Sequence, residues 1–199
     1  MAVIETTRRQ DELSYRQRWS HYFALLFGAL GLFIGVNLRD SALNAALVYT
    51  NREAGVRAEY PENWLIDETG DYIFRVRDFT QVGFKTTIQV AARPVSAVTS
   101  ARNLVEALTL NRSQTLSSYT VFRIEPFTLP DEVSATAVVY TYVATETNPF
   151  LESLPVVVEG LDLVTISRGQ AIIITFLSDS RTYEENYPRF QQFLTSLEF

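Results

Sequence analysis

The sequence predicts an α+β protein, with one N-terminal transmembrane helix followed by an antiparallel β-sheet packed between helices. Three observations predict this class. The first is a run without formal charge from Tyr22 to Leu38. The second is a series of segments that alternate apolar and polar residues, as half-buried strands do. The third is a closing segment whose apolar residues recur at helical spacing.

The uncharged run, YFALLFGALGLFIGVNL, is long enough to cross a bilayer. As a helix it extends roughly 25 Å, near the lower limit for a hydrocarbon core. A buried core helix and the apolar region of a cleaved signal peptide are the alternatives, because both accept runs of this length. Trp19, His21 and Tyr22 suit a headgroup layer, which favours a transmembrane helix over 21–38.

Basic residues set the expected orientation. Four arginines precede the run and only Arg39 follows it closely. The excess of positive charge places residues 1–20 in the cytoplasm and the C-terminal bulk on the extracytoplasmic side of a bacterial inner membrane. The preceding arginines are Arg8, Arg9, Arg16 and Arg18.

Small residues form a stripe along the predicted span. Ala24, Gly28, Gly31 and Gly35 follow one another at intervals of four, three and four residues. In lipid, such a stripe lets a second helix approach closely, which predicts packing against the helix of another subunit. Glycine is also simply common in membrane helices, so this second interpretation stays open.

A stalk and linker are expected at 39–54, between the span and the folded domain. Leu43 and Leu47 lie one helical turn apart, which predicts that the helix continues to about Tyr49. Gly55 then breaks the helix. The folded, extracytoplasmic domain is expected to cover 55–199.

Seven segments of the domain are typical of strands. Arg168 and Gly169 join the last two as a hairpin turn, and Pro126 and Pro130 bracket a loop. The segment 171–176, AIIITF, is apolar on both faces, which predicts a central strand covered on each side. The strands are expected at 56–60, 72–77, 83–93, 119–125, 133–145, 154–168 and 170–178.

Two helices are expected to cover this sheet. Thr99 or Ser100 is suited to cap the first, which runs to about Leu116. Thr182 with Glu185 makes a capping box at the start of the closing helix. The faces expected against the sheet carry Leu104, Val105, Leu108 and Arg112 in the first helix, and Tyr183, Tyr187, Phe190, Leu194 and Leu197 in the second.

Composition excludes several classes of function. From residue 39 onward there are 13 basic and 20 acidic residues, so the domain would repel nucleic acid and anionic lipid headgroups. The chain has no cysteine and its one histidine is His21, beside the span. Nucleophilic catalysis by a Ser-His-Asp or Cys-His set is therefore not expected in the domain. The sequence also lacks a P-loop, a GxGxxG motif and an HExxH motif.

Residues 55–199 resemble the PsbP-like domains, which are related to an extrinsic protein of the photosynthetic oxygen-evolving complex. The shared features are Tyr60, Pro61 and Trp64 after an early strand, a capped helix after the first antiparallel strands, and the ending FLTSLEF. The matching residues of that ending are Phe193, Leu194, Ser196, Leu197 and Phe199. The resemblance implies an α/β/α sandwich and a non-catalytic role in binding or assembling larger complexes.

This chain departs from the PsbP-like pattern in two ways, which limit the family properties that can be expected of it. Secreted bacterial members often have a lipobox cysteine, whereas this chain is expected to keep a helix. Metal binding in some members uses histidine and carboxylate positions, yet the domain here has no histidine. No metal site, cofactor or catalytic residue is predicted. Lys85, the only lysine, lies in a predicted strand and is expected to face solvent.

Two functions follow from these observations. The first is a non-enzymatic accessory or assembly subunit of an energy-transducing membrane complex, photosynthetic or respiratory, with partners in the lipid bilayer and on the extracytoplasmic surfaces of other subunits. The second is a free-standing ligand-binding or sensor module tethered to the membrane. A subunit should expose an apolar contact patch. Its candidate residues are Tyr60, Trp64, Phe79, Phe84, Phe127, Phe150 and Leu151, with Phe150 and Leu151 the strongest.

Overall fold

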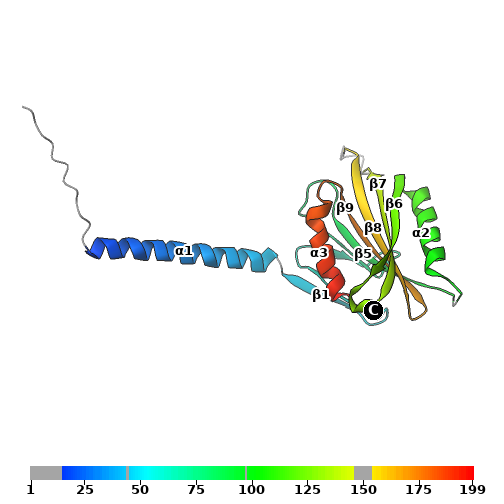
Figure 1. Ribbon diagram of the computed structural model, residues 1–199, viewed down its shortest axis with the longest axis horizontal. Helices are drawn as coiled ribbons and strands as arrows, with labels where there is room; N and C mark the ends of the chain where they lie inside the picture. The colour runs from blue at the N-terminus through cyan, green and yellow to red at the C-terminus, as the bar shows by residue number, and fades with distance from the viewer. Residues whose placement is uncertain (1–14, 44, 97, 146–153) are drawn as a thin grey trace, which may run out of the picture. The chain divides into compact units, whose positions relative to one another are not determined.

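Figure 1 shows the computed structural model, which describes residues 15–43, 45–96, 98–145 and 154–199. The chain divides into two compact units, Met1–Ala45 and Ala46–Phe199. Among the described residues, the first unit contains one long helix, and the second contains two antiparallel sheets and two α-helices. The α+β class, with an N-terminal helix before an antiparallel sheet and helices, is confirmed.

The N-terminal helix, α1 (Tyr15–Leu43), contains a candidate membrane span at Arg18–Ala42. None of the most apolar part of this span is buried, which is not the environment of a core helix. The expected span, 21–38, lies within it. Residues 15–20, which belong to the expected cytoplasmic segment 1–20, form the first turns of α1.

The predicted helical stalk is wrong beyond Leu43. Strand β1 (Ala46–Asn51) starts where the helix was expected to continue, and pairs antiparallel with β2 (Val56–Pro61). Tyr49 explains why a strand forms here instead of a helix, because its side chain is only 8% exposed and its ring centroid lies 4.3 Å from that of Phe74. Burial of an aromatic side chain outweighs a weak helical preference. The folded domain thus starts at Ala46 instead of residue 55.

The main sheet of the domain has seven strands in the order β3-β4-β5-β9-β8-β7-β6, and all neighbours are antiparallel. Strand β3 is a short edge strand that the sequence did not predict. The strands are β3 (Leu65–Asp67), β4 (Phe74–Arg77), β5 (Thr87–Pro94), β6 (Ser117–Thr128), β7 (Ser134–Ala144), β8 (Val156–Ser167) and β9 (Gln170–Asp179).

Two strand predictions had different outcomes. Pro126 was expected in a loop, but it lies inside β6, where Thr136 is its partner. A sheet tolerates proline there because β6 is an edge strand.

The hairpin at Arg168 and Gly169 is confirmed, since both residues have the positive φ of a primed turn, 50° and 77°. Strand β9 lies between β5 and β8, as the doubly apolar segment predicted.

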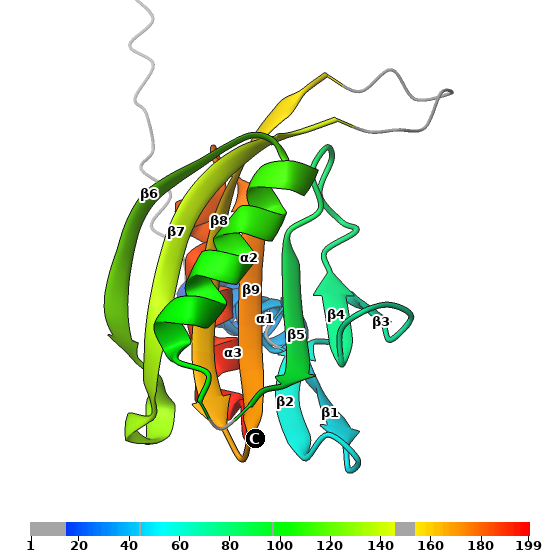
Figure 2. The ribbon, with the colours of Figure 1, turned by 90° about the vertical axis from the view of Figure 1, so that its right-hand side faces the viewer.

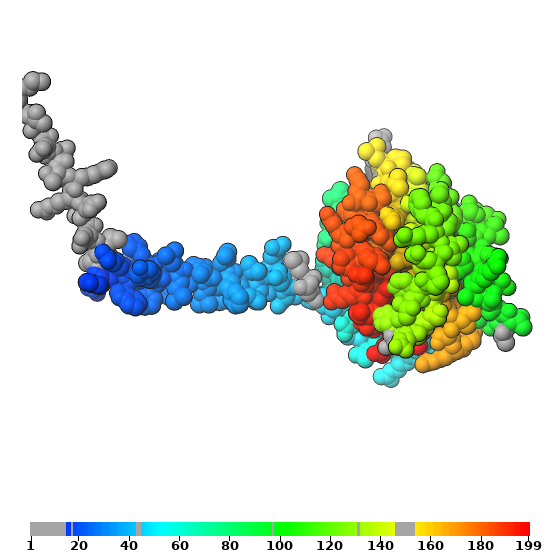
Figure 3. All heavy atoms as spheres, in the orientation of Figure 1, coloured from blue at the N-terminus to red at the C-terminus, as the bar shows by residue number. Residues whose placement is uncertain are grey.

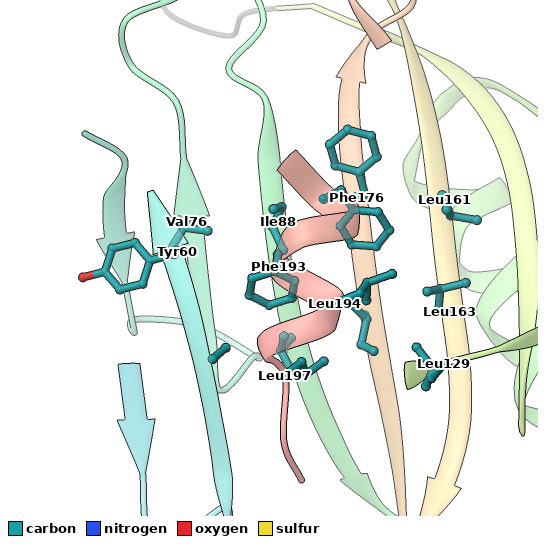
Figure 4. Close-up of a cluster of buried hydrophobic side chains, with 14 of the residues drawn as sticks. Tyr60, Val76, Ile88, Leu129, Leu161, Leu163, Phe176, Phe193, Leu194 and Leu197 are labelled. Carbon is teal, nitrogen blue, oxygen red and sulfur yellow. The ribbon is translucent and has the colours of Figure 1, made fainter. Parts of the chain in front are cut away.

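Helix α3 (Tyr183–Ser196) covers one face of the main sheet and contributes to the larger hydrophobic core. The expected stripe points into that core, where the Phe190 ring stacks on Phe176 with centroids 4.8 Å apart. Figure 4 shows Phe193, Leu194 and Leu197 among side chains of the sheet. The β1-β2 hairpin adds Tyr49 to the same core. In Figure 3 the orange and red atoms of α3 form part of the outer surface of the domain.

The predicted capping box of α3 is wrong. Thr182 is the N-cap residue, but its side chain makes no capping hydrogen bond. Its hydroxyl instead lies 3.5 Å from Ser178 Oγ and accepts a hydrogen bond from the side-chain Nδ2 of Asn186 at 3.3 Å. A network of neighbouring polar side chains therefore competes with the cap for this hydroxyl.

Helix α2 (Ala101–Thr115) covers part of the opposite face, in front of β7, β8 and β9 in Figure 2. Ser100 caps it as predicted, accepting a hydrogen bond from the Asn103 amide at 3.2 Å. Of this helix only Val105 is fully buried, beside the smaller core that includes Val138 and Tyr140. Together, α2, the main sheet and α3 form an α/β/α sandwich.

Candidate functional site

Polar side chains form a row across the main sheet on its α2 side. The strand registers align Asp67 of β3 with Arg75 of β4, then with Gln89 of β5 and Thr175 of β9. Thr175 is in turn the partner of Asp162 on β8. We call these five residues the polar row. Because alternate residues of a strand face opposite sides, all five lie on the same face.

One end of the polar row is buried beneath α2. Arg112 of α2 has 17% of its side chain exposed, whereas Asp162 has none. Arg112 Nε lies 2.6 Å from Asp162 Oδ2, and Arg112 Nη2 lies 2.7 Å from Oδ1. The Thr175 hydroxyl donates to Oδ1 at 2.6 Å. The Nη2–Oδ1 contact is a hydrogen bond, whereas the Nε–Oδ2 contact is a close ion pair without hydrogen-bond geometry.

Tyr140 completes the buried end. The Arg112 guanidinium lies 5.1 Å from the centre of the Tyr140 ring, and the Tyr140 hydroxyl donates to Asp162 Oδ1 at 3.4 Å. Gly160 makes room for the ring, since a Cβ at this position would lie 2.4 Å from a ring carbon. The ring, the guanidinium and the carboxylate therefore fix one another's positions.

Burial governs the electrostatics of this end. It raises the pKa of Asp162, and the Arg112 charge and the hydrogen bonds from Thr175 and Arg112 oppose that rise. Burial also raises the pKa of Tyr140 well above its usual value. Neither group has an open face for a substrate, because both are enclosed below α2. The pair is therefore suited to positioning α2 on the sheet.

The other end of the polar row is open, because α2 does not extend over β3, β4 and β5 in Figure 2. Arg75 donates to Asp67 Oδ2 at 2.6 Å, and Arg77 lies 3.7 Å from the same oxygen. Hydrogen bonds from the Thr69 amide, the Tyr72 hydroxyl and Arg75 hold the pKa of Asp67 well below its usual range. One carboxylate thus serves two arginines.

Next to these arginines lies Phe79, whose ring is flanked by two cations. The Arg77 guanidinium is 5.1 Å and the Lys85 ammonium 5.9 Å from the ring centre. Phe79 is 44% exposed, so one part of the ring faces solvent. Lys85 was expected to be exposed, but it is half-buried and donates to the Gln81 carbonyl.

A small cavity of about 40 Å³ lies elsewhere, where α3 ends against the turn after β6. Leu129, Val133, Leu194 and Leu197 are among the residues that line it. This volume is well below the several hundred Å³ that small-molecule sites usually have. Within the described residues, no group of three or more His, Cys, Asp or Glu side chains is placed to hold a metal ion.

The predicted helix-packing residues all lie on α1. Ala24, Gly28, Gly31 and Gly35 are exposed, and a Cβ added at any of the three glycines would have open space around it. Steric room for a neighbouring helix therefore exists along this stripe. Contact with another subunit stays a prediction.

The predicted partner-contact residues are scattered. Trp64 was expected to be available to a partner, but it is 3% exposed and belongs to the larger core beneath α3, which we call the α3-side core. Tyr60 is buried in the same core. Phe127 packs partly against it, and Phe84 packs against the smaller core beneath α2, the α2-side core. Of the set, only Phe79 is markedly exposed among the described residues. Phe150 and Leu151 lie outside the described residues.

Sequence reasoning missed Asp162, which anchors the buried end of the polar row. A signal was present, because Asp162 is the one charged residue in the apolar stretch GLDLVTI of β8. Arg112 was recognised on the apolar face of its helix. A charge on an apolar helix face and a charge in an apolar strand predict a buried pair when considered together.

Comparisons with known proteins identify the fold. A scan against models of protein families and a search of curated proteins find no match. Among solved structures, the solution structure of cyanobacterial PsbP from Synechocystis sp. PCC 6803 is similar, with a TM-score of 0.57 and 14% identity. It covers 77% of this chain and 92% of that protein. The crystal structure of a protein of unknown function from Pseudomonas aeruginosa gives a TM-score of 0.48 at 12% identity. That match covers 78% of this chain and 98% of the other protein.

Proposed function

We propose, with the PsbP-like fold as the premise, that this chain is a non-catalytic accessory or assembly subunit of an energy-transducing membrane complex. Helix α1 crosses the membrane and packs against helices of other subunits. The domain from Ala46 onward lies on the extracytoplasmic face and contacts their surfaces. The complex is a photosynthetic or respiratory one in the inner membrane of a bacterium.

The observation that carries the proposal is the exposure of α1. Large apolar side chains point outward all round this helix, and the most apolar part of its span has no buried residue. In water such a helix would be unfavourable, because apolar area removed from water contributes about 25 cal/mol per Å². Lipid or the helices of partners would cover this surface. The small-residue stripe offers the closest approach for a second helix.

The domain supports a binding role more than a catalytic one. Residues 46–199 contain neither histidine nor cysteine, so the commonest general bases and nucleophiles are missing. The buried Arg112–Asp162 pair is enclosed below α2. A cavity of about 40 Å³ also gives little support to a free-standing ligand-binding module.

The orientation rests on the distribution of arginines around α1. Arg16 and Arg18 lie within its first turns, and Arg39 alone lies near its end. The positive-inside rule then places the N-terminus in the cytoplasm.

Purification in mild detergent tests the subunit role. The double substitution Gly31→Leu and Gly35→Leu fills the small-residue stripe, and we expect it to remove most co-purifying partner. Ala29→Leu is the control, because it adds a leucine side chain on the other side of the helix and should leave the partner bound. Recovery of the unsubstituted chain as a lone monomer would contradict the proposal. An equal loss of partner in the control would contradict the specific role of the stripe.

A further inference from the structure

The open part of the α2-side face concentrates positive charge in an otherwise acidic protein. Between residues 72 and 94 there are four basic residues and one acidic residue, Asp78, and one of the four, Arg93, is paired with Asp71 just before this range. Asp78 is 1% exposed and its carboxylate lies 3.4 Å from Arg189 of α3, so it belongs to the other side of the sheet. Arg75 and Arg77 face the α2 side, and Asp67 is the one carboxylate paired with them in the part of the chain that the structure describes.

Lys85 adds a third cation beside them. Its ammonium donates to the Gln81 carbonyl, and no ion pair in the described part of the chain includes it. An ammonium has three donors, so this group has capacity for a carboxylate ligand. We call Arg75, Arg77, Phe79 and Lys85 the Phe79 surface.

The Phe79 ring gives this surface an apolar centre. Arg77 and Lys85 lie against the ring within the range of cation–π attraction, which holds both cations close to it. At 44% exposure, Phe79 retains apolar area that a partner would cover. Phenylalanine and arginine, the types of Phe79 and Arg77, are both enriched at the cores of protein interfaces.

We propose that the Phe79 surface docks an acidic segment of a partner protein, one that also places a large apolar side chain against Phe79. This inference rests on the proposed function and names the chemistry of one contact between the subunit and its complex. Charge complementarity selects the occupant, because this cluster is basic within a domain of 13 basic and 20 acidic residues from position 39 onward. That overall charge disfavours an anionic bilayer surface as the occupant.

The single lysine makes a direct test practicable. A carbodiimide joins an amine to a carboxylate that touches it, so treatment of native membrane fragments should link Lys85 to an aspartate or glutamate of the partner. Mass spectrometry of the linked peptides identifies both residues. We expect the partner carboxylate to lie in a segment where acidic residues outnumber basic ones.

Three variants and a salt series sharpen the test. Lys85→Arg keeps the charge but removes the amine, so the link should disappear while the partner still co-purifies. Arg77→Gln keeps Lys85 and should lower the yield several-fold. Arg123→Gln, an exposed arginine paired with Glu125 on β6, is the matched control and should leave the yield unchanged. Raising the salt to about 1 M should lower the yield, because the screening length then falls to about 3 Å.

Three results would overturn the proposal. They are the absence of any link at Lys85, a link only to this chain or to a second copy of it, and a link that is equally strong in Arg77→Gln. Acetylation of Lys85 in the purified full chain provides a further measurement. If vesicles containing phosphatidylglycerol, but not vesicles of phosphatidylcholine alone, slow this acetylation, the surface faces lipid headgroups and the protein-docking proposal fails.

The two proposals fail in distinguishable ways. Loss of the Lys85 link with the partner still bound through α1 would remove the Phe79 surface alone. Conversely, a lone monomer in detergent would contradict the proposed stable complex, whereas a persistent Lys85 link in membranes would show that the Phe79 surface still meets a partner there.

Discussion

The two faces of the main sheet are built from different chemistry. On the α3 side, aromatic and aliphatic side chains such as Phe74, Phe176 and Phe190 are fully buried. On the α2 side, the polar row crosses the strands and only part of the face is covered. The α3 side gains its stability from burial of apolar area, which tolerates exchanges between apolar side chains of similar volume. The α2 side depends on a few directional contacts, which specify geometry.

Phe190→Ala should give the largest effect, because it removes a fully buried ring that stacks on Phe176. We expect a loss of about 4 kcal/mol in the free energy of unfolding, from lost transfer and the cavity left behind. Urea unfolding followed by the fluorescence of buried Trp64 measures it. Phe122→Ala, at a residue 65% exposed, is the control and should change stability by less than about 0.5 kcal/mol.

Arg112→Met should cause the second-largest loss of stability, because it removes the ion pair at the buried end of the polar row. It leaves the Asp162 carboxylate without its guanidinium, and we expect about 3 kcal/mol of destabilisation. Adding Asp162→Leu should recover most of this loss, since a well-packed apolar pair replaces the charges. Urea unfolding of Arg112→Met, of Asp162→Leu alone and of the double variant completes the double-mutant cycle. A double variant as unstable as Arg112→Met would mean that the pair itself contributes net stability.

Gly160→Ala tests how tightly the α2 side is packed. The added methyl group would lie 2.4 Å from the Tyr140 ring, so the ring must shift from its place beside Arg112 and Asp162. We expect a loss of about 2 kcal/mol, typical of overpacking. In a Tyr140→Leu background the same substitution should have a much smaller effect, which a double-mutant cycle measures. Equal effects in both backgrounds would show that the ring is not the obstacle.

Asp67→Asn should have the smallest effect and should appear mainly in acid. Because the folded-state pKa of Asp67 is lowered, its stabilisation is present above the unfolded pKa of about 3.9 and is lost as the pH falls below that value. The variant should therefore lose less stability than the parent chain between about pH 4 and pH 2. Thermal unfolding across this range measures the difference. Parallel profiles for the two chains would exclude the Asp67 contribution.

More of the α3 side than of the α2 side could be predicted from the sequence. The stripe from Tyr183 to Leu197 and the doubly apolar β9 predicted the α3-side core, because apolar periodicity is a local property. The α2 side was predicted only as far as Arg112 and the Ser100 cap. Its partner Asp162 is 50 positions away, a separation that no local pattern spans. Strand β1 was missed for a similar reason, since Tyr49 gains its burial from Phe74.

The sequence by itself determined the α+β class, the candidate membrane span, the turn at Gly169 and the absence of cysteine. These features follow from hydropathy, periodicity and composition, which each segment carries alone. Only the tertiary structure decided that Asp162 meets Arg112, that Trp64 is buried, and that Arg77 and Lys85 flank Phe79. Such neighbours depend on strand register and on where a helix lies over the sheet, and both are set by the fit of the whole core.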